Sequence, residues 1–424
     1  MFVWRLISIT VLCSAVLILA PIGLYLWLYH DYMQGESMIQ TEDHFSPISC
    51  SQYIAARSVW AAELTLTPAL ELTQEYNDNI LFAEENKVKD TVTKTTPKFH
   101  ASLAGEDYSF TAGGLLRVRE YWDKNDLDTV DLSTDLSAAV QLTPRLGTRV
   151  SGSYLKDTTL ESELEATGLV LSQRNRRRRH GAAGLNYLID DRTALDFDAG
   201  HTRVEYEDPG LVDYTANGVD LALARSMKDK RGTAKAHFHV TDYRYRPNEY
   251  QDYGLTLGYL YRFTELSALD VAAGVRLTQS HIETLTDTTR EKSWGGLGNL
   301  VLSWESKKAS ARLGYVRELT ASGLGEPIEK NRIYVTVSHR FSERFTGEVY
   351  SEYFHSKSEG DFTRIDEKFF RVRPSLRVRL SERIWAQLAY EYARSRNELS
   401  NADAVRNRVY LTLSGTWPRK HRFP

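Results

Sequence analysis

Cysteine is scarce in this chain, and so are long apolar stretches and any excess of one charge. Only 2 cysteines occur among the 424 residues, Cys13 and Cys50, so the rest of the chain has neither a disulfide framework nor a cysteine metal site. A formal net charge of -3 argues against a nucleic-acid-binding protein, whose affinity depends on a basic surface. A mean hydropathy of -0.42 excludes a bundle of membrane-spanning helices, which needs several apolar stretches of about 20 residues.

The N-terminal part holds the single long apolar run, from Leu6 to Tyr29, with Arg5 before it. The run is longer than the core of a typical secretory signal, about 7–15 residues, and long enough to span a membrane as a helix. A removed export signal and a retained anchor are both open interpretations, and the sequence does not indicate a cleavage site. We expect the export signal, because the rest of the chain needs export, and assign residues 1–62 to a hydrophobic signal segment with an irregular linker.

Apolar and polar side chains alternate through most of residues 63–417, which is the period of a β-strand. In VDLSTDLSAAVQL (130–142), for example, valine, leucine and alanine fall on one face and aspartate, serine and glutamine on the other. About eighteen such runs follow one another, separated alternately by short turns and longer polar loops. They begin near residues 64, 91, 107, 128, 147, 180, 193, 214, 233, 252, 268, 294, 309, 332, 345, 368, 384 and 406. The pattern predicts one all-β domain over 63–417, followed by a C-terminal tail, 418–424.

Alternation alone is typical of a soluble sandwich or solenoid as well as of a membrane barrel, because each has one apolar face. The runs reach about 10–13 residues, whereas strands of soluble proteins average roughly 5–6 residues. A tilted strand needs about 9–11 residues to cross a bilayer, so the length of these runs suits a membrane barrel. Aromatic residues such as Trp304, Phe341 and Trp417 lie near the ends of runs, where membrane interfaces favour them. We therefore expect a transmembrane, antiparallel up-and-down β-barrel of about 18 strands in the Gram-negative outer membrane, with its short turns in the periplasm.

One strand carries a column of arginines that indicates which face lines the interior. In KFFRVRPSLRVRL (368–380) four basic side chains share one face: Arg371, Arg373, Arg377 and Arg379. Facing lipid near the midplane would cost roughly 2–4 kcal/mol each, so we expect them inside, where a barrel of about 16–18 strands leaves an aqueous channel. Two interpretations stay open: guanidinium sites for a passing anionic polymer, or structural ladders with Glu348 and Glu352 of the preceding strand.

The densest basic run adjoins the longest outer loop, 157–177. It consists of Arg176, Arg177, Arg178 and Arg179. It is either a solvated rim or a contact for phosphates of outer-leaflet lipopolysaccharide. His237 and His239 also share a face, but the sequence places no third metal ligand beside them, so we interpret them as lumen histidines.

The sequence contains no catalytic signature of the G-x-S-x-G, H-E-x-x-H, GxGxxG or P-loop type. We therefore expect no enzymatic activity, no catalytic residues, no metal and no cofactor. A membrane-embedded lipase or protease is a third, disfavoured interpretation.

The start of the predicted barrel resembles a family of outer-membrane β-barrel porins found alongside exopolysaccharide synthesis and export genes. The resemblance rests on TPALELTQEYNDNILF (67–82), with its Tyr76, Asp78, Asn79 and Ile80, and on Thr95-Thr96-Pro97 in the second strand. The chain departs from that pattern in its long N-terminal apolar run and in the residues that follow Trp417. The resemblance implies a conduit for a secreted polysaccharide, with periplasmic export components as partners.

From these observations we expect an export conduit for a polysaccharide through a polar, arginine-containing lumen, in contact with outer-membrane lipid and without nucleic acid. The alternative is a general diffusion porin for small hydrophilic solutes. The sequence leaves open the identity of the solute, the oligomeric state and whether an outer loop folds into the lumen.

Overall fold

The computed structural model describes residues 62–170, 172–246, 248–283, 288–358 and 364–423. The expected export segment lies outside these residues. The described part contains a short 3-10 helix, η2 (Asn125–Leu127), and one α-helix, α2 (Thr159–Thr167). Its strands are β1 (Ala62–Asn77), β2 (Asp90–Ala104), β3 (Tyr108–Tyr121), β4 (Thr129–Thr143), β5 (Leu146–Thr158), β6 (Asn175–Asp190), β7 (Thr193–Tyr206), β8 (Tyr214–Ser226), β9 (Gly232–Arg244), β10 (Glu249–Arg262), β11 (Ser267–Glu283), β12 (Thr288–Glu305), β13 (Ala309–Ala321), β14 (Pro327–Arg340), β15 (Phe345–Ser358), β16 (Asp366–Arg379), β17 (Ile384–Asn397), β18 (Asp403–Thr416) and β19 (Arg419–Phe423).

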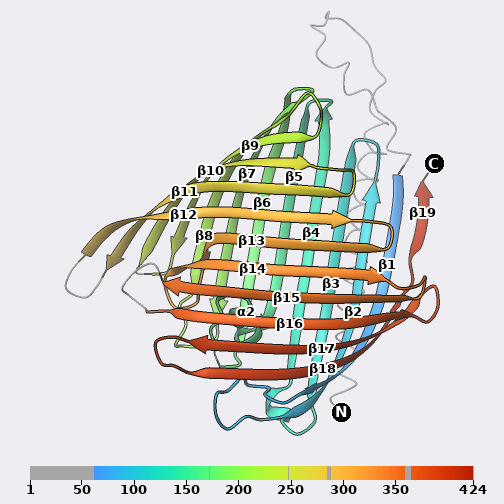
Figure 1. Cartoon of the computed structure of the whole chain (residues 1–424), viewed down its shortest axis with the longest axis vertical. Coiled ribbons are helices and arrows are strands. Elements are labelled where there is room, and N and C mark those ends of the chain that lie inside the picture. Colours follow the sequence, from blue (N-terminus) through green and yellow to red (C-terminus); the bar gives the residue numbers. More distant parts are fainter. Residues whose placement is uncertain (1–61, 171, 247, 284–287, 359–363, 424) are drawn as a thin grey trace, which may run out of the picture. The chain divides into compact units, whose positions relative to one another are not determined.

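The strands form one antiparallel sheet that closes on itself (Figure 1). Each strand from β1 to β18 pairs with the next, and β18 pairs with the second half of β1, from Ala69↔Thr416 to Asn77↔Arg408. After a break at Trp417 and Pro418, β19 pairs with the first half of β1, from Ala62↔Phe423 to Leu66↔Arg419. The segment expected as a tail therefore contributes a strand that continues β18. The predicted up-and-down barrel is confirmed.

Large apolar side chains are exposed on the outer face of the barrel. Val150, Leu257 and Leu411 are 59%, 65% and 57% exposed, and similar residues recur on nearly every strand. A soluble protein rarely exposes an apolar belt of this extent, whereas a barrel in a bilayer needs one. Because the closed ladder leaves no unpaired edge in the hydrocarbon layer, the barrel meets the other requirement of a spanning structure. The protein is an outer-membrane barrel.

Within the described residues, no helix is both long and apolar enough to cross a membrane.

Connections differ at the two ends of the barrel. Turns such as 144–145 and 191–192 are short, whereas the other end carries loops such as 78–89 and 159–174. In outer-membrane barrels the short turns face the periplasm, so the long loops face outward. Three strands reach further into the outer loops than the alternation predicts: β6 begins at Asn175, β12 at Thr288 and β14 at Pro327. The extensions of β12 and β14 are mostly polar, so they show little of the apolar alternation by which a strand is recognised in the sequence. The extension of β12 pairs only with β11, whereas that of β14 pairs with both β13 and β15.

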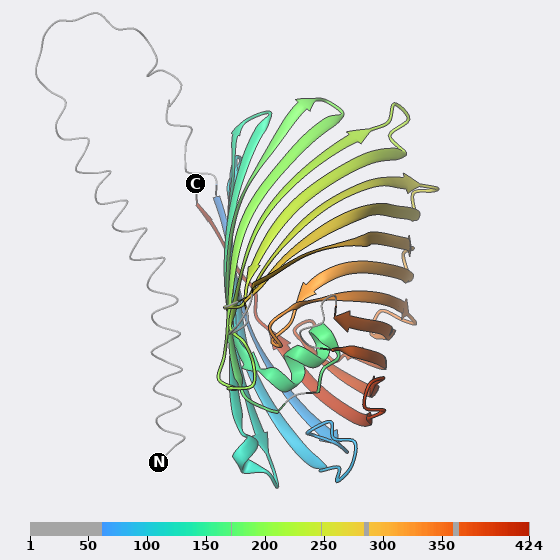
Figure 2. The same ribbon diagram turned by 90° about the vertical axis from the view of Figure 1, so that its left-hand side faces the viewer.

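The apolar core lies inside the outer mouth of the barrel, beneath inward-folded loops. Its main cluster joins two leucines of α2 to side chains of the β1–β2 loop and of the wall strands; the members are Phe82, Leu160, Leu164, Phe354, Phe369, Ala393 and Ala404. A second cluster joins Leu169, after α2, to Ile328, Leu324 and Ile365. Figure 2 shows α2 on the inner side of the curved wall. The loop 157–177, which the sequence analysis left open, therefore folds into the lumen.

Candidate functional site

The helix α2 forms a bar inside the outer half of the lumen. Its sequence, TLESELEAT, places Glu161 and Glu165 four residues apart on one face, and Glu163 on the opposite face. Glu165 accepts a hydrogen bond from Arg371 of β16 at 3.0 Å, and Glu161 accepts from Arg406 of β18 at 3.0 Å. Glu163 accepts from the hydroxyl of Tyr206, on β7, at 2.8 Å. The helix thus makes charged contacts to opposite parts of the wall.

Side chains of the barrel wall also donate hydrogen bonds to backbone carbonyl groups at the C-terminal end of α2. Lys330 of β14 donates to the carbonyl oxygens of Glu165 and Ala166, at 2.9 and 2.7 Å. The Ser395 hydroxyl donates to the carbonyl of Gly168 at 2.8 Å. Gly168 caps the helix in the left-handed region, with φ 85°. These bonds satisfy carbonyl groups that a helix end otherwise leaves free.

Glu161 and Glu163, which lie on opposite faces of α2, have pKa values shifted in opposite directions. Burial opposes ionisation of Glu161, but the guanidinium groups of Arg406 and Arg408 outweigh it and hold the pKa well below the usual 4.5. Burial raises the pKa of Glu163, against the lowering effect of the Tyr206 hydroxyl and Arg176. Glu161 is therefore the charged anchor of the helix at neutral pH.

A second inward loop, 322–326 between β13 and β14, meets α2 across the mouth. Ser322 and Glu326 are fully buried, and the carbonyl of Gly323 accepts a hydrogen bond from the backbone of Val212 in the β7–β8 loop at 2.7 Å. Leu324 of this loop packs in one cluster with Leu169, which follows α2. The sequence analysis placed 157–177 among the outer loops and left open whether an outer loop folds inward; the acidic repeat in 161–165 was the available signal.

The arginine column of β16 lies on the lumen face, and its members differ in their partners. Arg371 is 13% exposed and binds both Glu352 of β15 and Glu165 of α2. Glu352 also accepts from Arg332 of β14 at 3.0 Å. Arg371 and Glu352 thus belong to a structural ladder that includes the helix.

The rest of the column continues from α2 toward the periplasmic turns. Arg373 lies 5.7 Å from the ring centre of Tyr350, and Arg377 lies 4.2 Å from that of Trp385 and donates to the side-chain oxygen of Gln387 at 3.4 Å. Among the described residues, no carboxylate forms an ion pair with Arg373, Arg377 or Arg379, and Glu348 likewise has no such partner. These three guanidinium groups keep their charge available to a solute.

The basic run at the start of β6 divides between the two faces of the wall. Arg176 points inward and binds Asp157, at 2.8 and 3.0 Å. Arg178 shares that inner face. Arg177 and Arg179 lie on the outer face, where they pair with Glu207 at 2.8 Å and Glu205 at 3.5 Å.

The lumen histidines each have a separate acidic neighbour. His237 lies 2.9 Å from Asp220, and His239 lies 3.0 Å from Asp252. These contacts give each imidazole its own hydrogen-bond partner and leave the two rings 5.6 Å apart.

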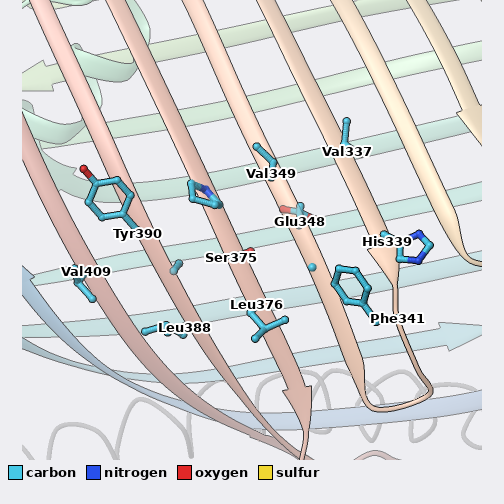
Figure 3. Close-up of a pocket in the computed structure, with 13 residues that line it drawn as sticks. Val337, His339, Phe341, Glu348, Val349, Ser375, Leu376, Leu388, Tyr390 and Val409 are labelled. Carbon is cyan, nitrogen blue, oxygen red and sulfur yellow. The ribbon is translucent and has the colours of Figure 1, made fainter.

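An apolar groove lies on the outside of the barrel, away from the lumen. Figure 3 shows Val337, Phe341 and Leu388 around it, and Pro374 also lines it. Pairing of β16 with β17 skips Arg373 and Pro374, because proline lacks the N–H that the ladder needs. This apolar groove faces the acyl chains of the membrane, so it is not the site of solute passage.

The closed wall, the apolar outer belt and the polar, constricted lumen together define a porin-type outer-membrane barrel. No protein-family model matches the chain, and no curated protein sequence does.

Among solved structures, the chain is similar to several at low identity. OccAB4 of Acinetobacter baumannii is 11% identical, with a TM-score of 0.46 over 85% of this chain and 98% of that one. OccK2 (OpdF) of Pseudomonas aeruginosa is 10% identical, with a TM-score of 0.45 over 84% and 98%. The outer membrane protein opdK of the same species is 11% identical, with a TM-score of 0.42 over 83% and 99%. At these identities the likeness concerns the fold alone, and the expected association with exopolysaccharide export gains no support from it.

Proposed function

We propose that this protein is an outer-membrane channel for the diffusion of small hydrophilic solutes, with anionic solutes favoured. The observation that carries the proposal is the docked helix α2 inside the lumen, with the unpaired arginines of β16 on its periplasmic side. Passage requires no covalent chemistry.

The docked loop supports small solutes over a polymer. α2 is anchored by Glu161, Glu163 and Glu165 to the wall on opposite sides of the barrel. A polysaccharide chain would have to pass this bar or displace it, and displacement would leave buried Arg406 and Arg408 without Glu161. The export conduit, with its periplasmic partners, is therefore the less supported interpretation.

The preference for anions follows from three guanidinium groups on the periplasmic side of α2, which outnumber the one unpaired carboxylate that the described residues place beside them, Glu348. Arg373, Arg377 and Arg379 are spaced along one strand, and a guanidinium group offers two parallel donors to a carboxylate. Several weak sites in series attract an anion without retaining it, which a channel requires.

Reversal potentials across planar bilayers test this proposal. We expect selectivity for the anion of a salt gradient, and a roughly two-fold or larger fall in the anion-to-cation permeability ratio when Arg373, Arg377 and Arg379 are all changed to Gln. The matched control changes Lys368, Arg394 and Arg396 to Gln, which removes the same charge from the outer face of β16 and β17. Equal selectivity in both triple variants would refute the anion preference.

A second measurement separates small solutes from polymer. Added soluble polysaccharide should leave the current unchanged, and deletion of the gene should leave secreted polysaccharide at its normal level. Accumulation of polymer in the periplasm of the deletion strain would instead establish the export conduit.

A further inference from the structure

A cluster of basic side chains on the outer face of the barrel is separate from the lumen. We call it the outer basic patch and define it by Lys156 of β5, Arg177 and Arg179 of β6, and Arg203 of β7. The register sets these residues side by side: Tyr154 and Lys156 lie opposite Arg179 and Arg177, and Arg179 lies opposite Arg203. Arg177, Arg179 and Arg203 are 43%, 54% and 54% exposed.

The patch is not neutralised by its own carboxylates. Glu205 forms ion pairs with two arginines, Arg203 at 2.9 Å and Arg179 at 3.5 Å. Glu207 forms an ion pair with Arg177. Four cations therefore share two carboxylates. By contrast, Arg394 on the outer face has a carboxylate partner of its own, Asp403.

The direct juxtaposition of Arg179 and Arg203 is unfavourable by itself, because like charges opposite each other destabilise a sheet. An anion bound from outside would relieve this repulsion. Guanidinium groups in pairs suit phosphate in particular, since each offers two parallel donors.

The position of the patch along the membrane normal indicates which phosphate-bearing ligand can reach it. The patch lies at the loop ends of β5, β6 and β7, on the outer side of the membrane. The exposed apolar side chains Leu185 and Phe197 lie on the same face, six residues closer to the periplasm than Arg179 and Arg203. At roughly 3.3 Å per residue, this is a distance of about 20 Å. A ligand with phosphates at the patch and acyl chains over Leu185 and Phe197 would satisfy both parts of the face.

We propose that the outer basic patch binds the phosphates of a glycolipid of the outer leaflet, of the lipid A type. Arg179 and Arg203 together bind one phosphate, while Arg177 and Lys156 contact the sugar headgroup next to it. This contact is independent of solute passage, because the patch and the lumen are on opposite faces of the wall.

Binding of purified protein in detergent to defined lipids tests the proposal, with native mass spectrometry as the readout. The probes are bisphosphorylated lipid A, the same lipid without phosphates, phosphatidylglycerol and inorganic phosphate. We expect retention of the bisphosphorylated lipid alone, and a loss of about ten-fold or more in affinity when Arg179 and Arg203 are both changed to Gln. The double change to Lys should retain part of the affinity, because the charge remains but the paired donors are lost.

The control variant is Arg394→Gln, which removes an exposed outer-face arginine with its own carboxylate partner. Unchanged lipid A binding in the Arg179→Gln and Arg203→Gln double variant would overturn the proposal. So would equal binding of phosphatidylglycerol or inorganic phosphate, which would reduce the patch to a general anion attractor. Normal gel mobility before heating confirms that each variant is folded, and an unchanged reversal potential keeps the result distinct from the channel proposal.

Discussion

At the scale of single residues, the charge on Glu161 decides whether the helix in the lumen stays docked. This carboxylate lies 3.0 Å from Arg406 and 3.1 Å from Arg408, whose side chains are only 2% and 7% exposed. Glu391 is their other carboxylate partner. Removing Glu161 would leave two buried cations to one anion, at a cost of about 1–3 kcal/mol to the docked state.

The pH dependence of the current tests this role. Because the pKa of Glu161 is depressed in the docked state, its stabilisation is complete above about 4.5 and is lost only as the pH falls through the depressed pKa. The pKa of Glu163 is raised, so proton uptake there favours docking as the pH falls. We expect single-channel conductance to stay constant from pH 7.5 to about 5, and open-channel noise to appear only in stronger acid.

The matching variant is Glu161→Gln, which should show larger and noisier currents already at pH 7. Open-channel noise that appears on acidification near pH 6 would contradict the assignment, because a depressed carboxyl does not titrate there and protonation of Glu163 favours docking.

At the scale of one element, α2 is a short helix whose stability comes from its surroundings. Nine residues are too few for a stable isolated helix in water. Leu160 and Leu164 pack against Phe354 and Phe369 of the wall, and the wall also supplies the donors that cap its C-terminus. The helix and its docking are therefore formed together.

The cap residue offers a precise test of this element. A Cβ on Gly168 would lie 3.1 Å from the ring of Phe354, and φ of 85° is a conformation that side chains disfavour. We expect Gly168→Ala to destabilise docking by at least about 1 kcal/mol, seen as faster limited proteolysis within the β5–β6 loop.

Gly152→Ala on β5 is the control, since a Cβ there meets nothing closer than 3.7 Å. Equal cleavage rates for both variants and wild type would show that the loop does not depend on this cap.

At the scale of the whole molecule, closure of the barrel depends on both ends of the chain. β1 pairs with β18 along one half and with β19 along the other, so the last strand is completed only by Arg419–Phe423. Without β19, residues Ala62–Leu66 would pair on one side only and present an open edge at the periplasmic rim.

Removal of residues 418–424 should therefore lower the temperature at which the folded form converts to the unfolded form in gel-shift assays, by a few degrees or more. The double variant Lys420→Gln and Arg422→Gln keeps the strand and loses only exposed ion pairs with Glu63, which contribute little. It should behave like wild type. If the truncated protein matched wild type in heat resistance, β19 would have no part in closure.

Much of the fold was predictable, because alternation with period two is a local property. The runs marked the strands to within a few residues from β1 to β11, apart from the early start of β6 at Asn175. The same alternation placed Arg371 and Arg373 on one face, and the cost of charge in lipid indicated the lumen side. The first residues of β12 and β14 were not predicted, because these mostly polar segments lack the alternation of apolar and polar side chains.

The sequence by itself therefore determined the barrel, its outward apolar belt and the inward direction of the arginine column, through alternation together with run length, the placement of aromatic residues and the cost of charge in lipid. Only the tertiary structure decided which charges are neutralised. Arg371 meets Glu165 across 206 residues of sequence, and Arg408 meets Glu161 across 247, because the β5–β6 loop turns inward and reaches strands formed by the end of the chain. Such pairing depends on the path of a loop through the lumen, which no local periodicity encodes.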